Sequence, residues 1–96
     1  MHARVTQFGF PKERVDETVK YTKEQIIPNA KKQPGFRHGY WMLDRAVGKG
    51  MAVVIFDSEA SVRATDEGAA RRNAGTEQAT GGKVTSVDRY EVHAEA

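Results

Sequence analysis

Gln33-Pro34-Gly35-Phe36, followed by Gly39-Tyr40-Trp41-Met42-Leu43 and then by Val53-Val54-Ile55-Phe56-Asp57-Ser58-Glu59, is the stretch that decides the fold. The proline and glycine end a helix, because neither residue continues helical geometry easily. An aromatic-rich strand follows over residues 40–45, and a glycine-containing turn reverses the chain. An almost uninterrupted apolar strand over 51–57 then runs into Ser58, a good helix N-cap. The stretch therefore predicts a β-hairpin between two helices.

Two further strands and two helices flank this hairpin. Residues 3–10 and 84–92 have the composition of strands. The spacing of apolar residues predicts a helix over 11–33, which Pro28 should kink or end near Ile27. A second helix is expected over 59–78, with an inner face made of Val62, Thr65, Ala69 and Ala70.

Together these elements predict an α+β fold. Strand, helix, hairpin, helix and strand in this order form a ferredoxin-like βαββαβ plait. Its antiparallel four-stranded sheet carries both helices on one face. The chain has 96 residues and no interdomain linker, so we expect a single domain over 1–96.

Composition excludes several classes of partner. The net charge is +2, and the strand at 51–57 offers one aromatic and no basic residue, so nucleic acid is not expected. No segment approaches the ~20 apolar residues of a membrane span. The chain has no cysteine, which excludes disulfides and thiolate chemistry. We expect a cytoplasmic protein.

The strand at 51–57 also predicts self-association. Alternate residues on both of its sides are apolar, with Val53 and Ile55 on one side and Val54 and Phe56 on the other. One set packs on the helices, and the other needs a cover. A second copy of the same sheet is the simplest cover. We therefore expect a homodimer with a cavity between the two sheets.

The chain resembles the antibiotic-biosynthesis-monooxygenase-like (ABM-like) branch of the dimeric α/β barrels. The resemblance spans residues 3–92 and is carried by Gln33-Pro34-Gly35-Phe36 and by Phe56-Asp57-Ser58-Glu59, where the family usually has Trp-Glu-Ser-Glu. It implies a dimeric barrel and, for an enzyme, a cofactor-independent monooxygenase-like reaction. The protein would then supply a dry pocket while the substrate supplies the electrons.

Haem-degrading relatives use an Asn on strand one, a Trp on strand three and an iron-ligating His on helix two. The comparable positions here hold Gln7, Phe56 and either Thr65 or Asp66, and residues 59–78 contain no histidine. Threonine and aspartate do not replace imidazole on haem iron. We therefore expect no haem and no other cofactor.

A metal site is not expected either. His2, His38 and His93 are the three histidines, and none of them has short ligand spacing to another. Solvent-exposed histidines at strand ends are the simpler interpretation. His38 has the best claim to a role because it leads into the aromatic strand.

Candidate site residues lie on the strands. Tyr40 and Trp41 point to opposite faces, so one packs in the core and the other faces the cavity, where it would stack on a planar ligand. Arg4 and Arg89 either hold an anionic oxygen there or are solvated rim charges. Asn29 is interpreted as a helix-end cap. The catalytic candidates are His38, Tyr40, Trp41 and Arg4. The ligand-binding candidates are Gln7, Trp41, Val54, Phe56 and Arg89.

Two functions remain open on the sequence. One is a cavity that binds a small aromatic or apolar molecule and oxygenates it without a cofactor. The other is a non-catalytic protein of the same fold, either a small-molecule binder or a structural module whose pocket is filled by side chains. The departures at Gln7, Phe56 and Thr65 favour taking the second seriously.

Overall fold

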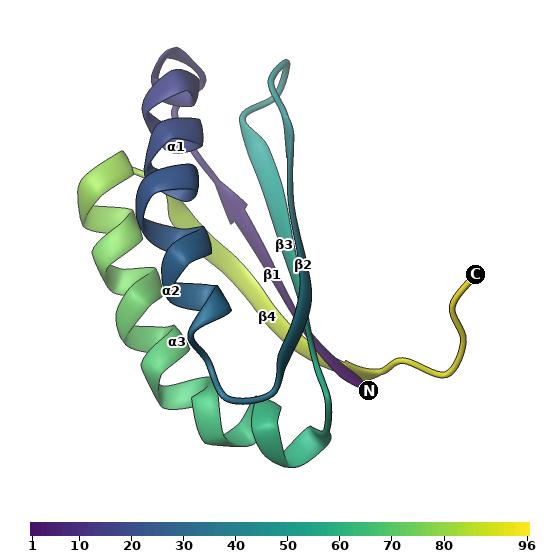
Figure 1. The fold of residues 1–96 in the computed structure, drawn as a ribbon. Coiled ribbons are helices and arrows are strands. Elements are labelled where there is room, and N and C mark those ends of the chain that lie inside the picture. Colours follow the sequence, from purple (N-terminus) through teal and green to yellow (C-terminus); the bar gives the residue numbers. More distant parts are fainter.

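The computed structural model describes residues 1–96, whose strands form one antiparallel sheet with the order β2-β3-β1-β4 (Figure 1). The strands are β1 His2–Gly9, β2 Phe36–Asp44, β3 Lys49–Phe56 and β4 Lys83–Glu91. All helices lie on one face of this sheet, and the other face carries no element of the chain (Figure 1). The predicted ferredoxin-like plait is confirmed.

The first helical layer is one continuous run with an irregular centre. It consists of a 3-10 turn Lys12–Arg14, α1 Val15–Tyr21, a π-helical turn Thr22–Ile26, and α2 Ile27–Lys31. Pro28 has no N–H with which to continue the regular ladder, and the widened turn lies directly before it. The predicted disturbance near Ile27 is confirmed, although helical geometry continues for another turn.

The second helical layer is α3, Glu59–Thr80. Ser58 caps it as predicted, because its Oγ accepts a hydrogen bond from the Ser61 N–H at 3.1 Å. Val62, Thr65 and Ala69 are buried as expected, whereas Ala70 is exposed and does not belong to the inner face. None of the helices in the chain is both long enough and apolar enough to cross a membrane.

The hairpin strands are longer than the sequence predicted. β2 begins at Phe36 instead of Tyr40, because the chain enters the sheet directly after the Pro34-Gly35 turn. Phe36 pairs with Phe56 and His38 pairs with Ile55, so Arg37 is an extra residue in the strand.

The two faces of the sheet differ in their surroundings. We call the side that faces the helices the inner face; its members are Arg4, Thr6, Phe8, Gly39, Trp41, Leu43, Gly50, Ala52, Val54, Phe56 and Val84. We call the other side the open face; its members include Ala3, Val5, Gln7, His38, Tyr40, Met42, Met51, Val53, Ile55 and Tyr90. The assignment follows from the strand register and the alternation of side chains.

The core is thin. Only 12 of the 96 residues are buried, and the largest fully buried side chains are Phe56 and Val62. The single chain covers β3 on the inner face only, so Val53 and Ile55 stay partly exposed. The expectation that this strand is covered on both faces therefore requires a second molecule.

Candidate functional site

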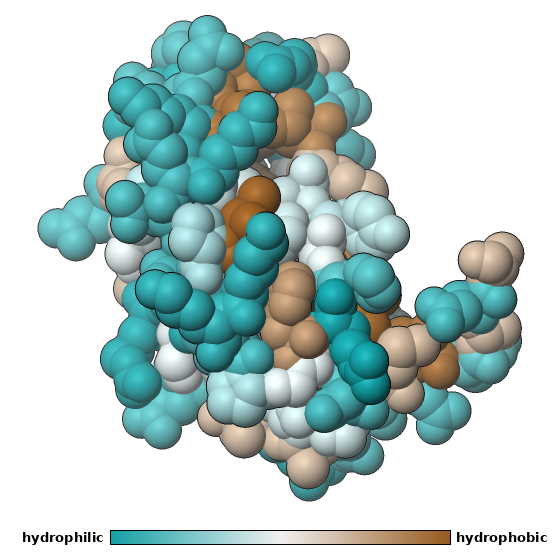
Figure 2. Space-filling model, in the orientation of Figure 1, coloured by the Kyte–Doolittle hydropathy of each residue, from teal (hydrophilic) through white to brown (hydrophobic).

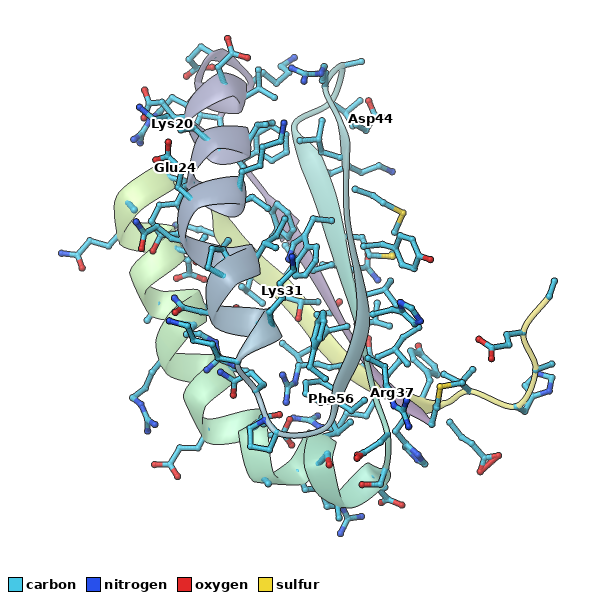
Figure 3. All side chains as sticks on the ribbon, in the orientation of Figure 1. Lys20, Glu24, Lys31, Arg37, Asp44 and Phe56 are labelled. Carbon is cyan, nitrogen blue, oxygen red and sulfur yellow. The ribbon has the colours of Figure 1, made fainter.

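A cavity of about 190 Å³ lies between the inner face and the helices. Figure 2 shows hydrophilic residues over the helices and apolar patches in the seam between the helical layer and the sheet. Phe56 points from β3 into the interior, whereas Lys20 and Glu24 lie on the outer side of the first helix (Figure 3). The volume is below the ~300–1,000 Å³ of a site for a drug-sized ligand, so it suits a molecule of one or two rings.

Aromatic rings form the sheet side of this cavity. Phe8, Trp41 and Phe56 line it from three different strands. A Cβ on Gly39 would collide with the Trp41 ring, and a Cβ on Gly50 would collide with the Phe8 ring. These glycines therefore let the two rings lie close against the sheet. The space above the rings stays free for a ligand.

Polar side chains form the helical side of the cavity. The first helix contributes Thr18, Tyr21, Thr22, Gln25, Asn29 and Gln33, and α3 contributes Arg72, Asn73, Thr76, Glu77 and Thr80. The side chain of Asn29 makes no helix-capping hydrogen bond and faces the cavity, which corrects its interpretation as a cap. The threonine hydroxyls donate to carbonyls of their own helices, so the side-chain amides are the groups that can donate to the oxygen atoms of a planar ligand.

Sequence reasoning missed this polar wall, although the sequence contains a signal for it. Thr18, Thr22, Gln25, Asn29 and Gln33 follow each other at intervals of three or four residues, which is the spacing of one helix face. The two threonine hydroxyls donate to carbonyls of the helix and would be tolerated in a packed core. The side-chain amides on the same face are the part of the pattern that indicates a lined cavity, since a packed core would leave such groups without partners.

Arg4 joins β1 to α3 at one end of the cavity. It is 5% exposed, and its Nη2 donates to the Val62 carbonyl at 2.8 Å and to Thr65 Oγ at 2.7 Å. Its Nε and Nη2 also donate to Asp66 Oδ1 at 3.1 and 2.9 Å. The guanidinium lies 5.4 Å from the centroid of the Phe56 ring. Arg4 thus holds the helix on the sheet, and only its Nη1 makes no hydrogen bond within the chain.

Asp66 serves two arginines. Its second oxygen, Oδ2, accepts from Arg89 Nε at 2.9 Å, so Arg89 is an ion-pair partner at the sheet edge and does not line the cavity. Burial raises the pKa of Asp66, but hydrogen bonds from Arg89 and Arg4 and their charges outweigh it. The pKa of this carboxyl therefore lies below its ordinary value.

The other candidate residues fall on two different faces of the sheet. Trp41, Val54, Phe56 and Arg4 line the cavity. Gln7, His38 and Tyr40 lie on the open face, away from these residues, because alternate residues of a strand face opposite ways. The open face is the side on which a cavity between two sheets is expected, so a role for these three residues in that cavity stays a prediction. Arg4 and Thr6 are the polar side chains that β1 turns toward the cavity between sheet and helices.

The position of the cavity also differs from our expectation. It lies within one chain, between sheet and helices, on the side opposite to a sheet-to-sheet interface. Val54, which we considered for that interface, faces the cavity instead. A space between two sheets requires the second copy and stays a prediction.

The three histidines occupy separate surroundings. His2 Nε2 lies 3.8 Å from Glu59 Oε2, His38 is on the open face, and His93 follows the last strand. No group of three or more His, Cys, Asp or Glu side chains gathers anywhere in the chain as a metal site would require.

The sequence matches no protein-family model and no curated protein. Among solved structures it is similar to a putative antibiotic biosynthesis monooxygenase from Deinococcus radiodurans, with a TM-score of 0.77, 9% identity, and coverage of 100% of this chain and 96% of that one. The fold is that of the ABM-like proteins. The resemblance noted in the sequence is thereby confirmed at the level of fold.

Other similar structures differ in what they bind. The ActVA-Orf6 monooxygenase of Streptomyces coelicolor, in complex with nanaomycin D, has a TM-score of 0.73 and 11% identity, with coverage of 99% and 89%. The haem degrader MhuD of Mycobacterium tuberculosis, with two haems bound in its active site, has a TM-score of 0.75 and 16% identity, with coverage of 100% and 99%. Two further matches, with TM-scores of 0.71 and 0.67, are described as dimeric ferredoxin-like proteins from an uncultured marine organism.

The cavity does not fit a haem. Its lining contains no histidine, cysteine or methionine, and the only residue of a haem-ligating type is Tyr21. Thr65 and Asp66, the two residues that we compared with the histidine of haem degraders, both accept hydrogen bonds from Arg4, at 2.7 and 2.9 Å. The volume of about 190 Å³ suits a smaller planar molecule.

Proposed function

We propose that this protein binds a small planar aromatic molecule in the cavity between its sheet and its helices. The observation that carries the proposal is the composition of the cavity wall, with the rings of Phe8, Trp41 and Phe56 on one side and amide and hydroxyl groups on the other. Rings contact the faces of a planar ligand, and the polar groups orient its oxygen atoms.

An oxygenase-like reaction without a cofactor is the activity that we propose for this cavity. In such a reaction an electron-rich phenol supplies the four electrons that reduce dioxygen, so that one oxygen atom enters the ring as the second quinone oxygen and the other leaves as water. The protein excludes bulk water and orients the substrate. Trp41 and Arg4 remain as candidates from the sequence, and Tyr21, Asn29 and Asn73 join them. The likeness in fold to monooxygenases supports this assignment.

A non-catalytic binder of the same ligand class is the second candidate, and one observation favours it. Glu77 is the only carboxylate in the lining, and its Oε1 accepts a hydrogen bond from the Val84 N–H at 2.8 Å. This bond holds one oxygen of the carboxylate on the backbone of β4, so Glu77 has a structural partner already. A structural module whose pocket is filled by side chains is disfavoured, since a cavity of about 190 Å³ remains between the sheet and the helices.

We propose a homodimer as the working form. The open face bears Val5, Met51, Val53 and Ile55, and Tyr40 and Met42 on it are 59% and 47% exposed. A second sheet would remove this apolar area from water without blocking the cavity, which lies on the other side.

Fluorescence of the single tryptophan tests the binding function. We expect 2-naphthol to change Trp41 emission in a saturable way, since Trp41 lines the cavity. Val54→Phe fills the same space and should abolish binding while the melting temperature is kept or raised. The matched control is Val47→Phe, in the hairpin turn, where the side chain is 58% exposed.

Oxygen uptake separates the two candidates. With 1-naphthol, the oxygenase predicts oxygen uptake and naphthoquinone formation above the uncatalysed rate, which Val54→Phe removes and Val47→Phe retains. Saturable binding without uptake favours the non-catalytic binder. If neither probe changes the Trp41 emission or the melting temperature, the binding function is wrong.

A further inference from the structure

Arg72 is the one arginine of the cavity wall without a carboxylate partner. It lies on α3 and lines the cavity, yet it takes part in no ion pair. No hydrogen bond from its guanidinium to another group of the chain is formed either. Its neighbour Arg71 is exposed and pairs with Glu67 at 3.1 Å, as is usual for helix-surface arginines.

The charges around Arg72 are mainly positive. Arg4, Arg72 and Lys83 line the cavity, and Glu77 is the only carboxylate that does so. Asp66 lies beside Arg4, but it also neutralises Arg89. The pKa of Arg72 is lowered, first by burial and then by the positive charges of Arg4 and Arg71. Burial and the nearby positive charges therefore disfavour the charged guanidinium of Arg72, and an anion beside it would offset this cost.

Arg4 provides a second donor to the same space. Its Nε and Nη2 are used by Asp66, Thr65 and the Val62 carbonyl, which fix the guanidinium rigidly. Nη1 has no partner within the chain, and it is not fully buried, since no fully buried side-chain nitrogen or oxygen lacks a hydrogen bond. Arg4 lines the cavity, so Nη1 is the donor that it can offer to a ligand there. A fixed donor costs little entropy when it binds a ligand.

We propose that the ligand of this cavity carries an anionic oxygen, as a carboxylate, phenolate or enolate on its aromatic ring, and that Arg72 binds this oxygen with Arg4 Nη1 as the second donor. The proposal rests on the binding function above and narrows its ligand class. A charge-assisted hydrogen bond in a partly buried site discriminates strongly between an anion and its neutral analogue.

A pair of probes with the same shape and different charge tests this assignment. 2-Naphthoate and 2-naphthamide are titrated against Trp41 fluorescence for the wild-type protein, Arg72→Gln and Arg71→Gln. The wild type should bind the carboxylate about tenfold or more tighter than the amide. Arg72→Gln should bring the ratio close to one by weakening the carboxylate alone, and Arg71→Gln should keep the wild-type ratio.

Stability distinguishes a ligand role of Arg72 from a structural one. Because Arg72 has no partner, Arg72→Gln should leave the melting temperature of the free protein unchanged or raise it. Equal binding of both probes by the wild type, or a preference that survives Arg72→Gln, would overturn the anion assignment and leave the cavity function standing. If neither probe binds, the cavity function and the anion assignment are both wrong.

Discussion

The inner and open faces of the sheet are built from the same strands, yet they differ in chemistry. The inner face encloses a cavity with aromatic rings, amides and a clamped arginine, and the helices cover it. The open face presents valines, isoleucine, methionines and tyrosines that no element of the chain covers. Neighbouring residues such as Val53 and Val54 therefore lie in different surroundings.

The difference supports our proposal that this small chain uses one sheet for both ligand binding and self-association. Polar groups on a packed face are tolerated only with partners or with solvent and ligand access, and the inner face has both. Exposed apolar side chains on a face without a cavity are typical of a surface that associates with another protein molecule. We therefore assign ligand binding to the inner face and self-association to the open face.

The largest effect is expected on the open face. Val53 pairs with Val5 and Tyr40 across the sheet, so Val53→Asp would place an unpaired charge in the centre of the proposed interface. Sedimentation at micromolar concentration should change from a mass near twice 10.7 kDa to one near 10.7 kDa, or to aggregates. Val47→Asp, on an exposed turn, should leave the mass unchanged. A wild-type monomer would contradict the assignment.

On the inner face, removal of Arg4 is expected to destabilise the protein most. Arg4→Met loses the hydrogen bonds to Asp66, Thr65 and the Val62 carbonyl, and the free energy of unfolding should fall by about 2–4 kcal/mol. Arg89→Met should cost less than about 1 kcal/mol, because its side chain is 45% exposed. Urea unfolding at a fixed protein concentration measures both. Equal decreases in the free energy of unfolding for the two variants would contradict the role of Arg4 in holding α3 on the sheet.

A smaller effect concerns acid. The pKa of Asp66 is lowered in the folded protein, so this group stabilises the fold above its ordinary value of 3.8, and the contribution is lost as the pH falls from there through the folded pKa. The unfolding free energy of the wild type should decline in that range. Asp66→Asn should begin with lower stability and decline less steeply. If the unfolding free energies of the wild type and of Asp66→Asn decline equally with falling pH, another group causes the loss of stability in acid.

Fold prediction succeeded because its signals were local. The Pro34-Gly35 stop, the N-cap at Ser58 and the apolar strand before it each act within a few residues, and together they define the plait. The boundaries of β2 were harder, because the extra residue Arg37 and the strand start at Phe36 depend on pairing with β3.

The site was only half predictable for a physical reason. β1 carries apolar residues at both parities, with Val5 on the open face and Phe8 on the inner face, so alternation alone does not tell which side meets the helices. The cavity on the inner face was therefore not predicted, whereas Gln7 lies on the open face, where the cavity between two sheets is expected. Whether Arg72 and Asn73 line the cavity depends on which side of α3 is turned toward the sheet. The sequence does not reveal this, because the pair Arg71-Arg72 looks like ordinary surface charge.

The single tryptophan and the three methionines allow both faces to be observed in one sample. Trp41 lines the cavity, whereas Met42 and Met51 lie on the open face, and Met1 is the remaining methionine. A protein labelled with ¹⁵N and with ¹³C at the methionine methyls would be titrated with 2-naphthol by NMR. We expect saturable shifts of the Trp41 indole and of the Asn29 and Asn73 side-chain amides, with the Met42 and Met51 methyls almost unmoved. Shifts confined to the methionine methyls, or no saturable shift at all, would contradict ligand binding on the inner face.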